Sequence, residues 1–93
     1  MNFTWLNKQG VENENGEIVQ FTGRFSAEYR KGGKVIELWV EDGIMGGTSI
    51  TYRRKDFEKW STGGGLLSPP EKEQALNTFR EALKFQGLVP DEE

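Results

Sequence analysis

The sequence predicts an α+β domain in which an antiparallel sheet of about four strands, connected as a meander, packs one face against a single C-terminal helix. Two observations lead to this prediction. Apolar and polar residues alternate between positions 18 and 54, which is typical of half-buried strands, whereas the apolar residues after position 68 follow helical spacing. The chain has 93 residues, enough for one core, so we expect a single domain spanning 1–93.

The longest alternating run extends from Ile18 to Arg30 and predicts one long strand. Its apolar positions share one face of that strand: Val19, Phe21, Phe25, Ala27 and Tyr29. Gly23 falls on the same face and has no side chain to pack there. We therefore expect a bulge or bend at this glycine.

A tight hairpin turn is predicted at Gly32-Gly33, because both central positions of such a turn favour a positive φ. The turn connects the long strand to a second strand, Val35 to Asp42. It sets a register that pairs apolar residues of the two strands: Tyr29 with Ile36, Ala27 with Leu38, and Phe25 with Val40. A shift by one residue would destroy this match, so the pattern itself supports the register.

Two more strands complete the predicted sheet. Gly43 to Gly47 is expected to form a turn before a third meander strand at Thr48 to Arg54. Phe3 to Asn7 is expected as a short first strand. The polar stretch that follows it contains the turn pair Asn15-Gly16.

A helix spanning about 69–86 is predicted by signals at both of its ends. Ser68 stands at the N-cap position and Glu71 at the third helical position, which together form a capping box around two prolines. Gly87 and Pro90 mark the other end. One apolar stripe at helical spacing should cover the sheet: Ala75, Leu76, Phe79, Ala82 and Leu83.

Three segments outside these elements carry their own predictions. Asp56 to Trp60 is expected to form one helical turn, capped by Asp56, that packs Phe57 and Trp60 as a corner. Residues 61–68 are expected to form a flexible loop; its glycine run lacks the Lys-Ser/Thr pair that a phosphate-binding loop requires. Residues 91–93 are expected to be a frayed acidic tail.

The sheet face that the helix leaves uncovered is where we expect a partner to bind. Its candidate residues are Arg24, Glu28, Glu37, Trp39, Glu41 and Arg53. The hairpin register opposes Arg24 to Glu41, a favourable pair, and Glu28 to Glu37, an unfavourable one.

Two interpretations of this face remain open. In the first, Trp39 is an aromatic anchor beside an acidic pair, which suits a basic protein surface. In the second, Arg30 or Arg53 neutralises the acidic pair and a neighbouring segment covers Trp39.

The composition points away from catalysis and from secretion. The chain contains no cysteine and no histidine, and so lacks a thiol nucleophile, the commonest general base and the usual transition-metal ligands. We therefore expect no enzymatic activity and no cofactor, with Glu28 and Glu37 as the best candidates for a catalytic carboxylate pair. The absence of disulfides and of an apolar run near Met1 favours a cytoplasmic location without membrane association.

A protein partner is favoured over nucleic acid. The formal net charge is −3, and on the uncovered face the arginines Arg24, Arg30 and Arg53 are matched by three glutamates, so a polyanion would gain little. A single-stranded nucleic-acid-binding protein that stacks bases on this face is the alternative function. The sequence is compatible with a monomer and with a homodimer.

Four segments together resemble the small immunity proteins of bacterial polymorphic toxin systems, in particular the group numbered seventy-four. They are Tyr29 to Glu41 with its Gly-Gly pair, Ser49 to Tyr52, Phe57 to Trp60, and Glu81 to Gly87. The resemblance implies a cytoplasmic, non-catalytic protein that neutralises a cognate toxin domain by direct binding. It carries over no site residue.

Overall fold

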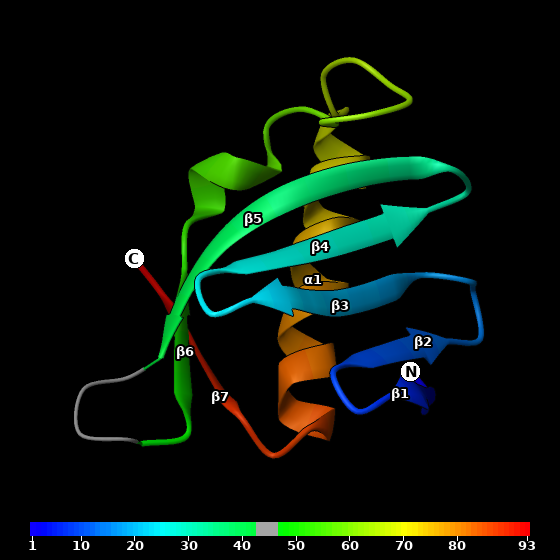
Figure 1. Cartoon of the computed structure of the whole chain (residues 1–93). Helices are drawn as coiled ribbons and strands as arrows, with labels where there is room; N and C mark the ends of the chain where they lie inside the picture. Colours follow the sequence, from blue (N-terminus) through cyan, green and yellow to red (C-terminus); the bar gives the residue numbers. More distant parts are fainter. Residues whose placement is uncertain (43–46) are drawn as a thin grey trace.

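The computed structural model describes residues 1–42 and 47–93 and shows a curled sheet lying against one long helix (Figure 1). Within those residues the sheet has seven strands in the order β1 to β7. They are β1 (Phe3–Asn7), β2 (Gly10–Asn13), β3 (Ile18–Gly23), β4 (Ser26–Lys31), β5 (Lys34–Asp42), β6 (Ser49–Tyr52) and β7 (Val89–Glu92). Neighbouring strands are antiparallel except β6 and β7, which are parallel.

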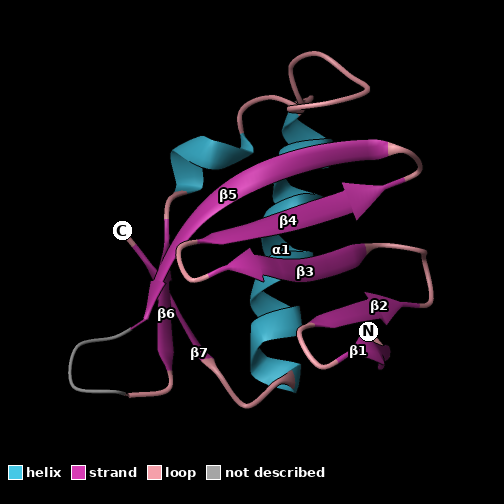
Figure 2. Cartoon of the chain, viewed as in Figure 1, coloured by secondary structure: helices cyan, strands magenta, loops and turns pink. Residues whose placement is uncertain are grey.

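The α+β class is confirmed, and the helix lies on one face of the sheet as expected. Helix α1 (Pro69–Phe85) crosses the sheet, and a short 3-10 helix, η2 (Arg54–Phe57), follows β6 (Figure 2). The predicted number of about four strands is wrong. The predicted long strand is divided in two, and β2 and β7 are additional strands.

The hairpin register around Gly32-Gly33 is confirmed. Both glycines have positive φ, 55° and 82°. Strands β4 and β5 pair Tyr29 with Ile36, Ala27 with Leu38, and Glu28 with Glu37. The turn therefore places the apolar residues of both strands on the face that α1 covers.

The prediction of one strand from Ile18 to Arg30 is wrong, because the chain reverses between Gly23 and Ser26. Strands β3 and β4 form a hairpin that pairs Phe21 with Ala27. Phe25 lies in the turn with its side chain 50% exposed, and it does not pack in the core opposite Val40. Only its carbonyl reaches that strand, accepting a hydrogen bond from the Val40 N–H at 3.2 Å.

The first part of the chain forms its own hairpin. Strand β1 is confirmed, and β2 returns beside it with Val11 fully buried. The Asn15-Gly16 pair lies in the following turn, where Gly16 has a φ of 76°. Strand β6 lies within the predicted third strand. The predicted turn from Gly43 to Gly47 includes residues 43–46, which lie outside the described residues.

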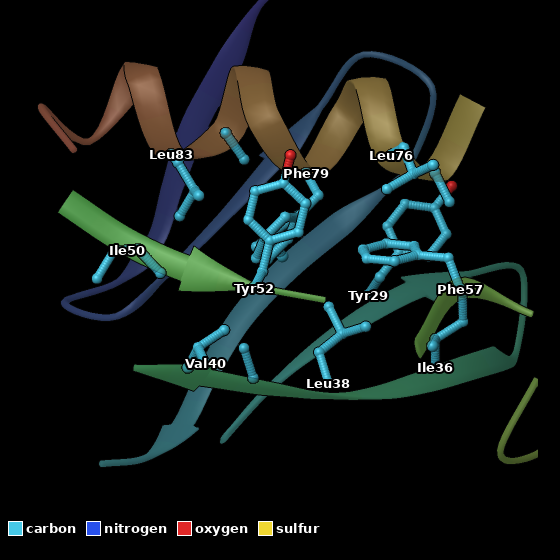
Figure 3. Close-up of a cluster of buried hydrophobic side chains, with 14 of the residues drawn as sticks. Tyr29, Ile36, Leu38, Val40, Ile50, Tyr52, Phe57, Leu76, Phe79 and Leu83 are labelled. Carbon is cyan, nitrogen blue, oxygen red and sulfur yellow. The ribbon is translucent and has the colours of Figure 1, made fainter. Parts of the chain in front are cut away.

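Helix α1 begins with the predicted capping box. The Ser68 hydroxyl accepts a hydrogen bond from the Glu71 N–H at 3.3 Å, and the Glu71 carboxylate accepts one from the Ser68 N–H at 2.8 Å. All five residues of the predicted apolar stripe are buried. They meet the sheet and η2 in one core, in which the ring of Phe79 lies 5.2 Å from Tyr52 and 5.7 Å from Phe57 (Figure 3).

The predicted frayed tail is also wrong. Residues up to Glu92 form strand β7, which pairs with β6. The Glu92 carboxylate accepts a hydrogen bond from Arg80 of α1 at 2.6 Å and one from the Tyr52 hydroxyl at 3.3 Å. These contacts fix β7 to both the sheet and the helix.

The loop at 61–68 is fastened to the outer edge of β5 by backbone hydrogen bonds. The Val35 N–H donates to the Thr62 carbonyl at 3.0 Å, and the Val35 carbonyl accepts from the Ser61 N–H at 2.7 Å. The Glu37 N–H donates to the Ser61 hydroxyl at 2.9 Å. The predicted corner is confirmed, since Phe57 and Trp60 are both buried.

A fully buried carboxylate, which the sequence pattern did not reveal, lies between the sheet and α1. Glu17 is 0% exposed and accepts hydrogen bonds from Asn13 at 2.8 Å, Thr78 at 2.9 Å, Gln74 at 3.1 Å and the hydroxyl of Tyr29. Burial acts to raise the pKa of Glu17, but these hydrogen bonds outweigh it and hold the pKa below its ordinary value. The buried charge is therefore well satisfied.

Candidate protein-binding surface

The side of the sheet that faces away from α1 carries five of the six predicted binding residues. We call this surface the open face and define it by Ser26, Glu28, Arg30, Val35, Glu37, Trp39, Glu41, Thr51 and Arg53. The register places these side chains together, because directly paired residues of antiparallel strands project from the same side. The face thus spans β4, β5 and β6.

Trp39 stands at the centre of the open face and is half buried. The guanidinium of Arg53 lies over its ring at 4.5 Å from the centroid. The Asp56 carboxylate accepts a hydrogen bond from the Trp39 N–H at 3.0 Å and lies 3.6 Å from the Nε of Arg53. The prediction that Asp56 caps a helical turn is therefore wrong, since its carboxylate bonds to the edge of β5 and Arg53 takes the N-cap position of η2.

The contacts of Trp39 correspond in part to the second interpretation of this face. Arg53 does cover one side of the ring, while a remaining part of the side chain stays accessible. Asp56 connects the two residues through the Trp39 backbone N–H and an ion pair with Arg53, while the buried Nε of Arg53 has no hydrogen-bond partner among the described residues.

The acidic pair lies as predicted, on directly opposed positions of β4 and β5. Glu28 is neutralised within its own strand, since Arg30 donates to it from Nε at 2.9 Å. Glu37 is exposed and has no cationic side chain within ion-pair distance among the described residues. Of the two carboxylates, Glu37 is the one available to a partner.

Arg24 does not belong to the open face. It lies in the β3–β4 turn, exposed, with its guanidinium over the ring of Phe25 at 5.3 Å. The predicted pairing of Arg24 with Glu41 is therefore wrong. Glu41 instead lies opposite Thr51, is exposed, and likewise has no ion-pair partner in the described part of the chain.

These positions change the charge balance of the open face. Arg24 is not on this face, so the cationic side chains of the face are Arg30 and Arg53. The carboxylates are Glu28, Glu37 and Glu41, together with Asp56, which borders the face next to Arg53. Arg30 is paired with Glu28 and Arg53 with Asp56, so the surplus negative charge belongs to Glu37 and Glu41. The predicted formal sum of zero is replaced by an acidic surface on either side of Trp39.

Two hollows lie outside the open face. One, of about 250 Å³, lies between the β4–β5 turn and the start of α1 and includes Tyr29, Lys31, Lys34, Trp60 and Glu71 in its wall. The Lys34 ammonium lies 4.6 Å from the Trp60 ring centroid and 3.2 Å from the Glu71 carboxylate, so its charge is already paired. The other, of about 290 Å³, lies between the β3–β4 turn and the end of α1.

In the part of the chain that the structure describes, no three acidic side chains converge in a way suited to a metal ion. Within residues 1–42 and 47–93, no helix combines the length and the apolar character needed to cross a membrane.

Comparison with known proteins finds no significant match to the chain among family models, curated proteins or solved structures.

Proposed function

We propose that this protein is a non-catalytic binding module that neutralises a cognate bacterial toxin in the cytoplasm by direct contact through its open face. The resemblance of Tyr29 to Glu41 and three later segments to immunity proteins suggests this class. The observation that carries the proposal is the placement of Glu37 and Glu41 on either side of the Arg53–Trp39 stack.

This arrangement suits a basic protein surface. Glu37 and Glu41 are exposed and have no ion-pair partner within residues 1–42 and 47–93, so they can pair with lysines or arginines of another molecule, and such charges speed association and select the partner. Trp39 adds a large ring that already stacks against the Arg53 guanidinium, which reduces the side-chain entropy lost when a partner covers it.

The same charges disfavour the alternative of a single-stranded nucleic-acid-binding protein. A polyanion would meet the surplus carboxylates, and both arginines of the open face are already paired with acidic side chains. We therefore do not propose nucleic-acid binding, and the experiment includes nuclease treatment in order to detect it.

The test is affinity capture from a lysate of the source cells, with and without nuclease. We expect a basic protein to bind the wild-type chain in both cases, and the Glu37→Lys/Glu41→Lys variant to lose it. Glu81→Lys/Glu93→Lys is the matched control, since it makes the same charge change at the helix surface and the last residue and should retain the partner.

A second measurement ties capture to neutralisation. Expression of the captured protein alone should arrest growth, and co-expression of the wild-type chain should restore it, whereas the double-lysine variant of the open face should not. The proposal is wrong if that variant captures and protects as well as the wild type, or if nuclease abolishes capture.

A further inference from the structure

The free edges of the sheet are protected to very different degrees. The edge formed by β7 carries Pro90 and ends in three acidic residues, both of which discourage pairing with another strand. The outer edge of β5 is covered by the loop at 61–68 and by the carboxylate of Asp56. Strand β1, at the other end of the sheet, has neither form of protection among the described residues; a register irregularity between Trp5 and Asn7 interrupts only its last part and leaves residues 3–5 regular.

The residues of β1 favour association. From Asn2 to Asn7 the sequence contains no charge and no proline. Trp5 is 52% exposed and Leu6 is 48% exposed. On the helix side, Phe85 at the end of α1 is 43% exposed and lies 5.8 Å from the ring of Trp5 and 5.7 Å from that of Phe3. An aromatic cluster therefore borders a free strand edge.

The backbone groups of β1 that point to the free edge follow from the neighbouring hairpin. The Asn13 N–H donates to the Glu17 carbonyl at 3.0 Å, so Asn13 points away from β1. Because backbone direction alternates along a strand, Glu12 points toward β1 and bonds to Thr4, its paired residue. Phe3 and Trp5 therefore present their N–H and C=O groups outward.

We propose that two copies of this chain form a homodimer by antiparallel pairing of their β1 strands around a two-fold axis at Thr4. In this register Phe3 of one copy lies opposite Trp5 of the other, and each such pair exchanges two backbone hydrogen bonds. Thr4 meets Thr4 of the second copy on the axis, a favourable cross-strand pair.

A second copy fits this edge because β1 is complementary to itself. With a two-fold axis perpendicular to the sheet, the helix-covered faces of both copies lie on the same side. Two residues can then be directly opposed only if their side chains project from the same face, which requires that both residue numbers be odd or both even. Phe3 and Trp5 satisfy this condition. Trp5 of each copy then covers Phe3 and Phe85 of the other, which completes both aromatic clusters. No like charges oppose each other between Asn2 and Asn7.

The test measures the mass of the full chain by sedimentation and light scattering over a range of concentrations. We expect a dimer of twice the 10.6 kDa chain mass that dissociates on dilution. Thr4→Lys places two ammonium groups on the axis, each directly opposite Glu12 of its own chain, and should weaken the dimer by up to roughly fivefold. Trp5→Ala removes both aromatic cross-strand pairs and should weaken it by more than roughly tenfold.

Matched controls separate the edge from general effects. Thr48→Lys adds the same charge at another exposed threonine, and Leu66→Ala removes a side chain that is 80% exposed elsewhere; both should dimerise like the wild type. Circular dichroism checks that every variant is folded. If Thr4→Lys does not fold, Thr4→Glu takes its place.

A mixture of Thr4→Lys and Thr4→Glu gives the sharpest readout of the axis. Each variant alone should dimerise more weakly than the wild type, and the mixture should form a tighter one-to-one dimer than either variant because opposite charges then face each other at Thr4. A wild-type chain that stays monomeric at millimolar concentration would overturn the dimer. A mixture that stays monomeric, or a Thr4→Lys dimer as tight as the wild type, would overturn the pairing at Thr4.

Discussion

The buried carboxylate of Glu17 accepts a hydrogen bond from the phenol of Tyr29, and this contact joins the β2–β3 turn to β4 directly beneath α1. Thr78 and Gln74 of the helix donate to the same carboxylate. One ionised side chain thus connects three parts of the fold that are distant in sequence. Its contribution depends on charge, because each partner donates a hydrogen bond to it.

Replacing Glu17 with glutamine should lower the free energy of unfolding by about 2–4 kcal/mol. The amide keeps the shape but puts an NH2 group in place of one carboxylate oxygen, where it faces either Tyr29 and Thr78 or Asn13 and Gln74, so one pair of donors loses its acceptor. Urea unfolding measures the change. Glu41→Gln is the control, since that side chain is exposed and should leave stability nearly unchanged; equal stabilities of both variants would contradict the role of Glu17.

Both tyrosines should remain protonated in the folded protein at pH values where free tyrosine ionises. Burial, and then the hydrogen bond to Glu17, raise the pKa of Tyr29 above its ordinary value of 10.0. Burial also raises the pKa of Tyr52, although the hydrogen bond from Arg80 opposes this. A raised pKa stabilises the fold below pH 10 and loses that effect as the pH rises through the folded value.

The ultraviolet absorbance of phenolate checks this directly, because the chain has only two tyrosines. We expect the signal to stay absent near pH 10 and to appear together with the loss of circular dichroism at higher pH. Tyr29→Phe leaves one phenol and should halve the final signal. Gradual ionisation at pH 10 in a chain that is still folded would show that the phenols are accessible.

Asp56→Ala should lower the free energy of unfolding by about 1–3 kcal/mol and accelerate hydrogen exchange at the Trp39 amide. The carboxylate is the acceptor for that N–H on an edge of β5 that has no neighbouring strand there, and it also holds Arg53 over the tryptophan ring. Asp56→Asn keeps an acceptor oxygen and should fall between alanine and the wild type. Unchanged exchange at Trp39 in the alanine variant would exclude this contact in solution.

The sequence predicted best where the local signals are strong. The Gly32-Gly33 turn determined the register of β4 and β5, and the Ser68 cap and apolar stripe determined α1. Both are decided by residues close together in the chain. The pairing of Glu28 with Glu37 followed directly from that turn.

The division of the long strand at Gly23 escaped detection for a physical reason. Strands β3 and β4 pair residues of equal parity, such as Phe21 with Ala27, so odd-numbered residues face the core before and after the turn. A hairpin of this parity has the same alternation as a continuous strand. The irregularity expected at Gly23 is present, since the register shifts between Phe21 and Gly23, but the chain reverses there instead of bending, and Arg24 was misplaced as a result.

The remaining errors concern tertiary contacts. Strand β7 contains Pro90 and acidic residues and shows no apolar alternation, so its sequence predicts a frayed tail and not a strand. Its position depends on hydrogen bonds from Arg80 and Tyr52 to the Glu92 carboxylate. Asp56 was predicted to be a helix cap from its neighbours in sequence, but its carboxylate accepts a hydrogen bond from the Trp39 N–H, 17 residues earlier, and local spacing cannot reveal that contact. Glu17 has no periodic signal, since its four partners come from three separate elements: β2, β4 and α1.

The parallel pairing of β6 with β7 has a consequence for how the molecule assembles. Strands β1 to β5 join through short turns and can associate as soon as each is made, but β6 gains its second neighbour only after α1 has formed and the chain has returned beside it. Pairing β7 with β6 is therefore expected to be the slowest folding step. Until β7 is in place, one edge of β6 is unpaired and can bind an incorrect strand.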